Sequence, residues 1–379
     1  MTSEARPTPR AERDPAIDAL RGLCLLGIAL VNVPWIGSPR SLAAYLFDEE
    51  LFAATPIWDL AAATLIEWTS EGKFYPQFSA LFGFGAGVLM ARGWGIYTRR
   101  IVVLFLFGVL HACFGWWGDI LLNYALVGAC LPLLYLLPER ALLGFSILTL
   151  IAGCALSYLY DGWLVPDLEG DAEYIAENIR IYGSGSFWEV SVHRAEDILH
   201  FFDPWNRSYR MNTLTMASFG LWVERAGLLN DLSTKRKQLG IAAIVLCSLG
   251  LVMSLGPWLY ILGGDVLGMG WAALFLWVAT GRHRARLLVL APVGRMAITA
   301  YLLQTVVFTL TFYAYGLGFY GLFGPLAGAF LALGVWWIEV GLARIWLDHF
   351  ALGPVEWLWR SLTYWKLIPM RRSSGAAAP

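Results

Sequence analysis

The feature that most limits what this chain can fold into is its series of long apolar runs. A helix needs about 20 mostly apolar residues to cross the hydrocarbon core of a bilayer. Runs of about this length predict helices near 17–36, 74–91, 101–117, 119–138, 141–160, 209–229, 239–257, 259–280, 291–313 and 322–344. The sequence therefore predicts an all-α, polytopic integral membrane protein with about ten transmembrane helices.

Composition supports this class and excludes others. Of the 379 residues, 58% are hydrophobic and only 15% are charged, whereas about a quarter of a soluble domain is charged. The net charge of −1 gives no support for a nucleic-acid partner. The five cysteines lie in apolar runs without metal-ligand spacing, so we interpret them as small buried hydrophobic residues and predict no metal site.

Lysine and arginine indicate the orientation of the helices, because positive residues concentrate in cytoplasmic loops. In a ten-helix arrangement every basic connection falls on one face. These segments contain Arg92, Arg99 and Arg100; Arg140; Lys235, Arg236 and Lys237; Arg282, Arg284 and Arg286; and the basic residues of both termini. We therefore expect both termini in the cytoplasm, with a tail at 1–16, a transmembrane domain at 17–344 and a cytoplasmic helix and tail at 345–379.

Two segments fall on the opposite, outer face in this arrangement. The acidic loop 161–208 is expected to form amphipathic helices on the outer surface. The stretch 51–69 is nearly long enough to span, but it contains Pro56, Asp59 and Glu67. We interpret it as a partly buried or interfacial helix on the outer side, because a full crossing would place Arg92, Arg99 and Arg100 outside.

Several segments resemble the YeiB-type family of bacterial membrane proteins, a domain-of-unknown-function family. They are RDPAIDALRGLCLLGIALVNV at the start, EGKFYPQFSALFGFGAGV at 71–88, the segment 99–126, GRMAITAYLLQT at 294–305 and GPVEWLWRSLTYWK at 353–366. They cover nearly the whole chain in order. The resemblance implies a multi-pass protein of the bacterial inner membrane.

The first helix also resembles that of integral-membrane acyltransferases, namely the acyltransferase-3 enzymes and the heparan-α-glucosaminide N-acetyltransferase. Both begin with an Asp-x-x-Arg-Gly pattern, here Asp18, Arg21 and Gly22. Asn32 stands where acyltransferase-3 enzymes have a histidine, and the N-acetyltransferase also has an asparagine there. The chain has no match to the functional histidine of the N-acetyltransferase or to the second arginine motif of acyltransferase-3. The resemblance implies acyl transfer.

His111 is the strongest candidate for chemistry. It lies ten residues into a helix expected to begin near Arg100, which is about 15 Å deep and near the midplane at 1.5 Å per residue. No other histidine is expected inside a span. A neutral histidine there is either a satisfied core group or a general base, and we favour the base.

Polar residues around this position complete the candidate site. Asp119 begins the next helix, where it would cap that helix, orient His111 or accept a substrate amine. Asn32 would act as an interhelical hydrogen-bonding group or as an oxyanion donor. Asp18 and Arg21 are three residues apart and expected to pair. We expect the cavity to be lined by Asp18, Asn123, Tyr124 and Gln304.

A donor site is expected at the cytoplasmic mouth. Arg21, Arg99 and Arg100 would bind the phosphates of coenzyme A, because a guanidinium holds phosphate bidentately. The alternative for Arg99 and Arg100 is that they only anchor the helix at the cytoplasmic face. The glycine-rich LFGFGAG at 81–87 lies inside a span, so we interpret it as close helix packing.

Three functional hypotheses follow. The first is a transmembrane acyltransferase that moves an acyl group, most simply acetyl, from a coenzyme A donor to a small-molecule, sugar or lipid acceptor. His111, Asn32 and Asp119 would be its catalytic residues, and it would bind no permanent cofactor. The second is a transporter or exporter of a small or amphipathic molecule that uses the same buried residues. The third is a non-catalytic assembly protein. Apart from the lipid bilayer, the candidate partners include a second copy of the chain in a homodimer.

The charge pattern makes a direct prediction about topology. A reporter fused at residue 379 should be cytoplasmic, and one inserted near Gly183 should be external. The measurement is the activity of compartment-specific reporters in cells. Two reporters on the same side would show that the ten-helix count is wrong.

Overall fold

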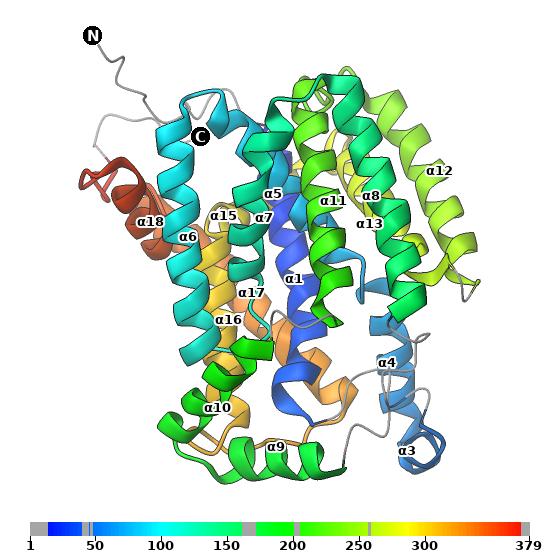
Figure 1. Ribbon diagram of the computed structural model, residues 1–379, viewed down its shortest axis with the longest axis vertical. Helices are drawn as coiled ribbons and strands as arrows, with labels where there is room; N and C mark the ends of the chain where they lie inside the picture. Colours follow the sequence, from blue (N-terminus) through cyan, green and yellow to red (C-terminus); the bar gives the residue numbers. More distant parts are fainter. Residues whose placement is uncertain are drawn as a thin grey trace.

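The computed structural model describes residues 14–39, 45, 48–160, 172–200, 205–256 and 259–372, and these form a helical bundle without strands (Figure 1). Its longer helices are α1 (Pro15–Gly37), α5 (Phe74–Met90), α6 (Trp94–Phe114), α7 (Ile120–Tyr135), α8 (Glu139–Tyr160), α11 (Trp205–Arg225), α12 (Arg236–Ser254), α13 (Tyr260–Ala279), α16 (Ala297–Phe312) and α17 (Pro325–His349). Shorter ones are α3 (Glu49–Ala54), α4 (Ile57–Thr69), α9 (Ala172–Ser184), α10 (Phe187–His200), α14 (Arg284–Leu287), η3 (Leu288–Leu290), α15 (Ala291–Arg295) and α18 (Pro354–Tyr364). The all-α prediction is confirmed.

Each of the ten segments expected to be helical coincides with helix in the described residues. The one expected at 291–313 is divided between α15 and α16, with a bend of 76° between the segments Arg284–Arg295 and Ala297–Phe312. Within the described chain, five helices are long and apolar enough to cross a membrane, or six with the bent pair. The five are α1, α6, α12, α13 and α17. A membrane protein is therefore shown, while the count of ten spans stays a prediction.

Helix α11 falls outside that set because it contains many polar side chains. Of these, Asn212, Thr213, Thr215 and Ser218 are buried inside the bundle. Helices α5, α7 and α16 are apolar but have only 17, 16 and 16 residues. A test by length and hydropathy passes over short helices and helices that place polar groups against other helices.

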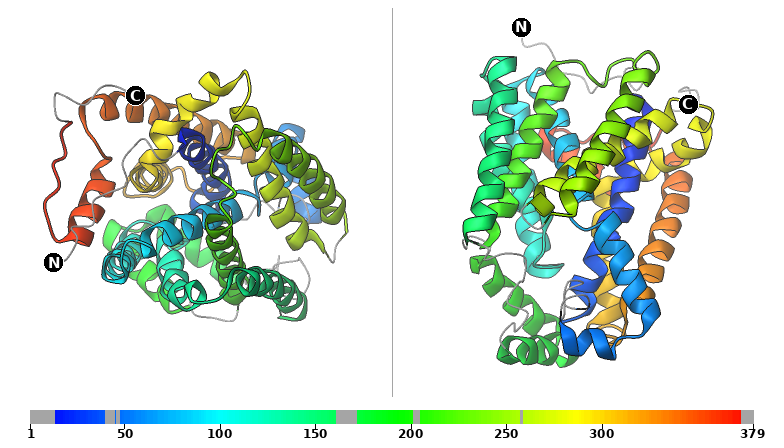
Figure 2. Two further views of the ribbon diagram at one scale, coloured as in Figure 1. Left: turned by 90° about the horizontal axis from the view of Figure 1, so that it is seen from above. Right: turned by 90° about the vertical axis from the view of Figure 1, so that its right-hand side faces the viewer.

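Helix α1 runs through the middle of the bundle, where it packs against α5, α13, α15, α16 and α17 (Figures 1 and 2). The contact with α15 is very close: a Cβ added at Gly294 would lie 1.8 Å from the carbonyl oxygen of Asp18. The indole Nε1 of Trp336 on α17 donates to the Gly22 carbonyl at 2.8 Å. Small residues at these positions allow α1 to be enclosed on several sides.

The glycine-rich segment of α5 packs closely against α11, as the sequence predicted. A Cβ on Gly83 would lie 1.8 Å from the carbonyl oxygen of Ala217, and one on Gly220 would lie 1.9 Å from that of Ala80. The backbones of α5 and α11 therefore approach each other at two successive turns. This contact brings the polar face of α11 into the bundle.

The helix connections divide between the two ends of the bundle. The connections α5–α6, α7–α8 and α11–α12 lie at the end that is uppermost in Figure 1, whereas α3, α9 and α10 lie at the other end (Figures 1 and 2). Arg284 of the basic turn after α13 pairs with Asp14 at the start of α1, with Nη2 and Oδ1 2.9 Å apart. The basic connections thus share one end, which agrees with the pattern of charges along the chain.

The stretch 51–69 forms α3 and α4, which lie at the end opposite the basic connections. Helix α4 has 13 residues, or about 20 Å at 1.5 Å per residue, which is too short to cross a bilayer. One face, containing Ala63 and Ile66, is buried, and α4 packs against α17. Its Asp59 also accepts the Leu326 N–H at 2.8 Å and so caps the start of α17. The partly buried helix that we expected is present.

Helix α18 fixes the start of α16 through one carboxylate. Glu356 accepts the backbone N–H groups of Ile298 and Thr299 at 2.7 and 3.1 Å, and the Thr299 hydroxyl at 2.5 Å. The first N–H groups of a helix have no partner within it and favour a negative charge. Burial raises the pKa of the Glu356 carboxyl, while the hydrogen bonds from Thr299 and Ile298 lower it.

Replacing Glu356 tests this cap. Glu356→Gln keeps the shape but removes the charge, so the free energy of unfolding should fall by about 1–3 kcal/mol. The measurement is unfolding of the purified protein in detergent. Glu177→Gln is the control, because the Glu177 side chain is exposed and the pKa of its carboxyl is lowered mainly by the hydrogen bond from exposed Arg180. Equal stability of the two variants would contradict the cap.

Candidate functional site

His111 lies near the end of α6, and this corrects its expected position. The helix begins at Trp94, well before the expected start near Arg100. His111 is therefore about 26 Å along the helix at 1.5 Å per residue, in its last turn, and not ten residues from its start. Helix α6 ends at Phe114, and a Cβ on the following Gly115 would lie 2.6 Å from the His111 ring.

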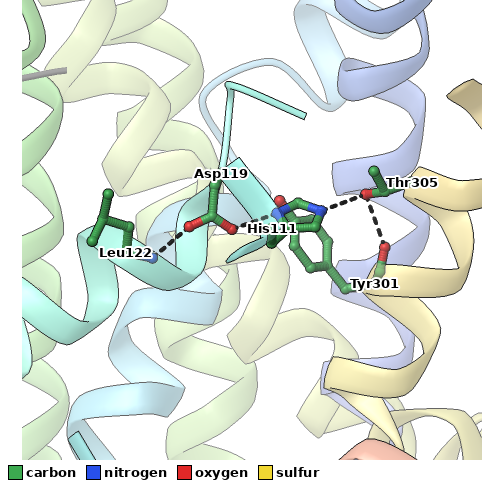
Figure 3. Close-up of polar contacts among 5 residues, drawn as sticks. All are labelled: His111, Asp119, Leu122, Tyr301 and Thr305. Carbon is green, nitrogen blue, oxygen red and sulfur yellow. Dashed lines mark hydrogen bonds and ion pairs between the residues drawn. The ribbon is translucent and has the colours of Figure 1, made fainter. Parts of the chain in front are cut away.

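Both ring nitrogens of His111 have partners from other segments (Figure 3). Nδ1 lies 2.7 Å from Oδ1 of Asp119, and Nε2 lies 3.0 Å from Oγ1 of Thr305 on α16. The Tyr301 ring packs beside the imidazole, with ring centroids 5.1 Å apart. His111, Asp119 and Thr305 are 7%, 2% and 2% exposed, so the row of three groups is enclosed by protein.

Asp119 has two of the three roles that the sequence allowed. Its side chain accepts the Leu122 N–H and caps α7, while its other oxygen contacts His111 (Figure 3). A carboxylate only accepts hydrogen bonds. Nδ1 of His111 therefore carries a proton, and Asp119 fixes the orientation and tautomer of the ring.

The Thr305 hydroxyl has two acceptors within reach, and it can donate its single hydrogen to only one of them at a time. Oγ1 lies 3.0 Å from Nε2 and 3.2 Å from the Tyr301 carbonyl oxygen. When the hydroxyl donates to Nε2, His111 is neutral. When it donates to the carbonyl, Nε2 can donate in turn and His111 carries a positive charge. The hydrogen bond between His111 Nε2 and Thr305 Oγ1 can therefore form with either atom as the donor.

Asn123 and Tyr124 follow Asp119 on α7 and contact helices other than α16. Asn123 donates to the Thr213 hydroxyl of α11 at 2.8 Å. The Tyr124 and Ser79 hydroxyl oxygens are 3.3 Å apart, and Tyr124 stacks on Phe82 of α5. The two predicted cavity residues are buried side chains that bind α7 to α5 and α11.

Gln304 contacts a residue that sequence reasoning missed. Its Nε2 donates to Oε2 of Glu339 on α17 at 2.7 Å, and both side chains are buried. Thr305, the next residue, was also missed. Glu339 could have been found as an acid inside the apolar run 322–344, whereas a threonine in an apolar helix gives no distinctive signal.

A second buried polar cluster was missed as well. Asn212 of α11 donates to Asp265 of α13 at 2.5 Å. Nearby, Lys73 is 1% exposed, donates to the Glu67 carbonyl oxygen at 2.8 Å and lies over the Tyr260 ring. Asp265 lies in the apolar run 259–280, and Lys73 lies in one of the segments that resembles the family, so both had a detectable signal.

The arginines predicted to form a donor site lie in two places. Arg21 pairs with Asp18, as expected, with Nη1 and Oδ1 3.1 Å apart, and its Nη2 donates to the Leu81 carbonyl of α5 at 3.2 Å. Arg100 instead stacks on Trp359 of α18, with its Cζ 3.6 Å from the ring centroid. Arg99 is half-buried and donates to the Gly95 carbonyl within its own helix.

Asn32 is half-buried on α1. The next residue, Val33, lines an apolar hollow together with Phe312 of α16 and Gly328 of α17. No hydrogen bond joins Asn32 to His111 among the described residues. The two are therefore separate parts of the predicted site in this conformation. Across the described chain, His, Cys, Asp and Glu side chains form no group of three or more that could hold a metal ion.

The fold defines the class of this protein, an all-α membrane protein, and comparison with known proteins gives its family. Residues 223–366 match the family described as "Protein of unknown function (DUF418)". The chain is 30% identical over 410 residues to the uncharacterized protein YxaH of Bacillus subtilis (strain 168), covering 98% of this chain and 99% of that protein. It is also 30% identical over 383 residues to the uncharacterized protein YeiB of Escherichia coli (strain K12), covering 93% and 96%.

This chain belongs to the YeiB-like DUF418 family. The family assignment confirms the resemblance seen in the sequence. It gives no activity, because the descriptions of the family and of both relatives state none. The function has to be argued from the residues.

The tautomer of His111 can be measured directly. In the wild type, ¹⁵N NMR of labelled histidine should show a protonated Nδ1, because the Asp119 carboxylate accepts there. In Asp119→Asn the amide can donate to Nδ1, so the proton should move to Nε2. The signal is assigned by its loss in His111→Gln. A wild-type signal from a neutral ring protonated at Nε2 would contradict the geometry described here.

Proposed function

We propose that the protein is a transmembrane acyltransferase of the bacterial inner membrane. It would transfer an acyl group, most simply acetyl, from coenzyme A to a hydroxyl or amine of a small-molecule, sugar or lipid acceptor. The observation that supports this proposal most is the row of Asp119, His111 and the Thr305 hydroxyl. A carboxylate, an imidazole and a hydroxyl in this order are the groups that general-base acyl transfer uses.

The proposed reaction uses Nε2 of the imidazole, the nitrogen that faces Thr305. The acceptor hydroxyl or amine would take the place of the Thr305 hydroxyl at Nε2 and transfer its proton to His111 as it attacks the thioester carbonyl carbon. The carbon–sulfur bond then breaks, and His111 returns the proton to the coenzyme A thiolate. Asp119 holds Nδ1–H throughout and stabilises the imidazolium that forms.

Access to His111 requires a change at α16. Thr305 and His111 are both buried in the described conformation, so we interpret this conformation as closed. Helix α16 is joined to α15 at a sharp bend, and its start is bound by α18 through Glu356. Movement of α16 away from α6 would expose Nε2 while leaving the His111–Asp119 pair intact.

Arg21 is the donor-binding candidate with the most support from the fold. Two of its nitrogens contact Asp18 and the Leu81 carbonyl, and the side chain keeps 16% of its surface exposed. It also belongs to the Asp-x-x-Arg-Gly pattern that resembles the acyltransferases. Arg99 and Arg100 would serve as secondary contacts or as anchors at the cytoplasmic face. Asn32 would contact the acceptor only after α1 and α6 are rearranged.

A transporter is the second candidate, and a specific observation favours it. The acids Glu339 and Asp265 are buried in α17 and α13, which are long and apolar enough to cross a membrane. Buried acids in spans often bind ions or carry protons. The two candidates differ in whether a product with a new acyl group is formed.

Replacing His111 separates catalysis from packing. His111→Gln should retain the fold and stabilisation by coenzyme A derivatives, while acyl transfer falls about a hundredfold or more. The measurements are thermal shift with acetyl-CoA and acyl transfer to a panel of acceptors on the same preparation. Arg21→Lys should weaken the thermal shift, because lysine lacks the bidentate fork.

His349→Gln is the matched control, because His349 is exposed at the end of α17 and its ring is hydrogen-bonded to the Ile345 carbonyl oxygen of its own helix. It should have wild-type activity. Near-normal transfer by a folded His111→Gln protein would exclude His111 as the base. Absence of any stabilisation by coenzyme A derivatives in the wild type would favour the transporter.

A further inference from the structure

Two buried acid–amide pairs in the bundle have the same pattern of hydrogen bonds. Gln304 Nε2 donates to Glu339 Oε2 at 2.7 Å, and Asn212 Nδ2 donates to Asp265 Oδ2 at 2.5 Å. In both pairs the second carboxyl oxygen and the amide oxygen are buried without any hydrogen-bond partner. All four residues are at most 8% exposed. The same two atoms are thus unsatisfied in each pair.

One added proton would satisfy both unsatisfied oxygens of a pair. An ionised carboxyl only accepts, whereas a protonated carboxyl also donates through its O–H. A primary amide and a carboxylic acid can exchange two hydrogen bonds, one from the amide N–H and one from the acid O–H. Burying an unpaired polar oxygen costs free energy, and burying an unpaired charge costs much more. The protonated form is therefore the one that fits these surroundings.

Neighbouring charges do not compensate an ionised Glu339. Helices α1, α4, α15 and α16 pack against α17. Their titratable groups near the bundle interior are Asp18, Arg21, Cys24, Asp59, Glu67, Arg295 and Tyr301, and none of these forms an ion pair with Glu339. Asp18 and Arg21 bind each other, and Asp59 caps α17. Gln304 is the polar partner of Glu339, and it is neutral.

Asp265 has one positive neighbour, which is bound elsewhere. The groups that face it are Asn212 of α11, Tyr75 of α5, Cys154 of α8 and Lys73. Lys73 donates to the Glu67 carbonyl oxygen and also interacts with the carboxyls of Glu67 and Glu71. Three acids thus surround one lysine, so its charge cannot balance all of them.

Each pair is linked along a helix to a residue that interacts with His111 or Asp119. Gln304 directly precedes Thr305, which contacts His111. Asn212 follows three residues after Tyr209 on α11, and Tyr209 interacts electrostatically with Asp119. Proton-binding groups at these two places would therefore share helices with contacts of a histidine whose chemistry depends on proton transfer.

We propose that Glu339 and Asp265 are proton-binding sites, each holding one proton as part of an acid–amide pair in the closed bundle. The ligand in each case is a proton, bound between the free carboxyl oxygen and the amide oxygen. This inference does not depend on acyl transfer, because it rests on the two pairs alone. It applies equally to an enzyme and to a transporter.

Infrared spectroscopy tests the proposal on the whole protein in detergent at neutral pH. Exposed acids are ionised under these conditions, whereas a protonated carboxyl has a carbonyl stretch that shifts in D₂O. Glu339→Gln and Asp265→Asn should each remove about half of the absorbance that the double variant removes. Glu177→Gln, an exposed control, should change nothing. An unchanged carbonyl band in both single variants would overturn the proposal.

Thermal unfolding gives a second, independent readout. The amide variants have the shape and neutrality of a protonated acid, so Glu339→Gln should be about as stable as the wild type at neutral pH. The wild type should then lose stability as pH rises further, because Glu339 would become an unpaired buried charge, and the variant should lose less. Strong destabilisation of Glu339→Gln at neutral pH would show that the ionised form is required. His111→Gln should leave the infrared band unchanged, which separates this proposal from that of acyl transfer.

Discussion

The interior of a helix bundle in a bilayer offers little water, so buried polar side chains must find partners on neighbouring helices. This constraint organises the protein. His111 contacts Asp119 and Thr305, and the side-chain N–H groups of Gln304 and Asn212 donate to Glu339 and Asp265. The close backbone contacts of α1 with α15, and of α5 with α11, allow such pairs to form. Buried polar atoms without partners are therefore informative, because each marks a place where a proton, a ligand or a different conformation would supply the missing hydrogen bond.

The same constraint explains why the site is built from several helices. His111 comes from α6, Asp119 from the start of α7 and Thr305 from α16. A short turn after α6 brings Asp119 back to His111, while α16 approaches from the other side of the ring (Figure 3). Outside the site, Arg194 of α10 donates to the Phe114 carbonyl oxygen at the end of α6. The segment that contains His111 is thus bound on several sides, which is the rigidity that a general base needs.

Much of the fold could be predicted from the sequence, because long apolar runs and alternating basic connections are strong signals. The contact between His111 and Asp119 was also within reach, since the two residues are only eight apart across a tight turn. Thr305 and Glu339 were not placed at the site, because Thr305 is 194 positions from His111 and Glu339 is 35 positions from Gln304, and such contacts depend on how helices pack. The expected position of His111 along its helix was wrong for a local reason: α6 continues back to Trp94 through a polar segment that hydropathy treats as a loop. The sequence placed Arg21 and Arg100 in one donor site. The structure instead shows Arg21 bound to α5 and Arg100 stacked on α18.

In the proposed reaction His111 Nε2 takes the proton from the acceptor as the acceptor attacks the carbonyl carbon of a coenzyme A thioester. The most direct measurement is a cryo-electron microscopy structure of the protein with a non-hydrolysable acetyl-CoA analogue. The account predicts that α16 moves from α6, that Thr305 leaves Nε2, and that the carbonyl group of the analogue lies close enough for an acceptor held by Nε2 to attack it. Binding of the analogue with the thioester position remote from His111, while the His111–Thr305 contact stays closed, would contradict the account.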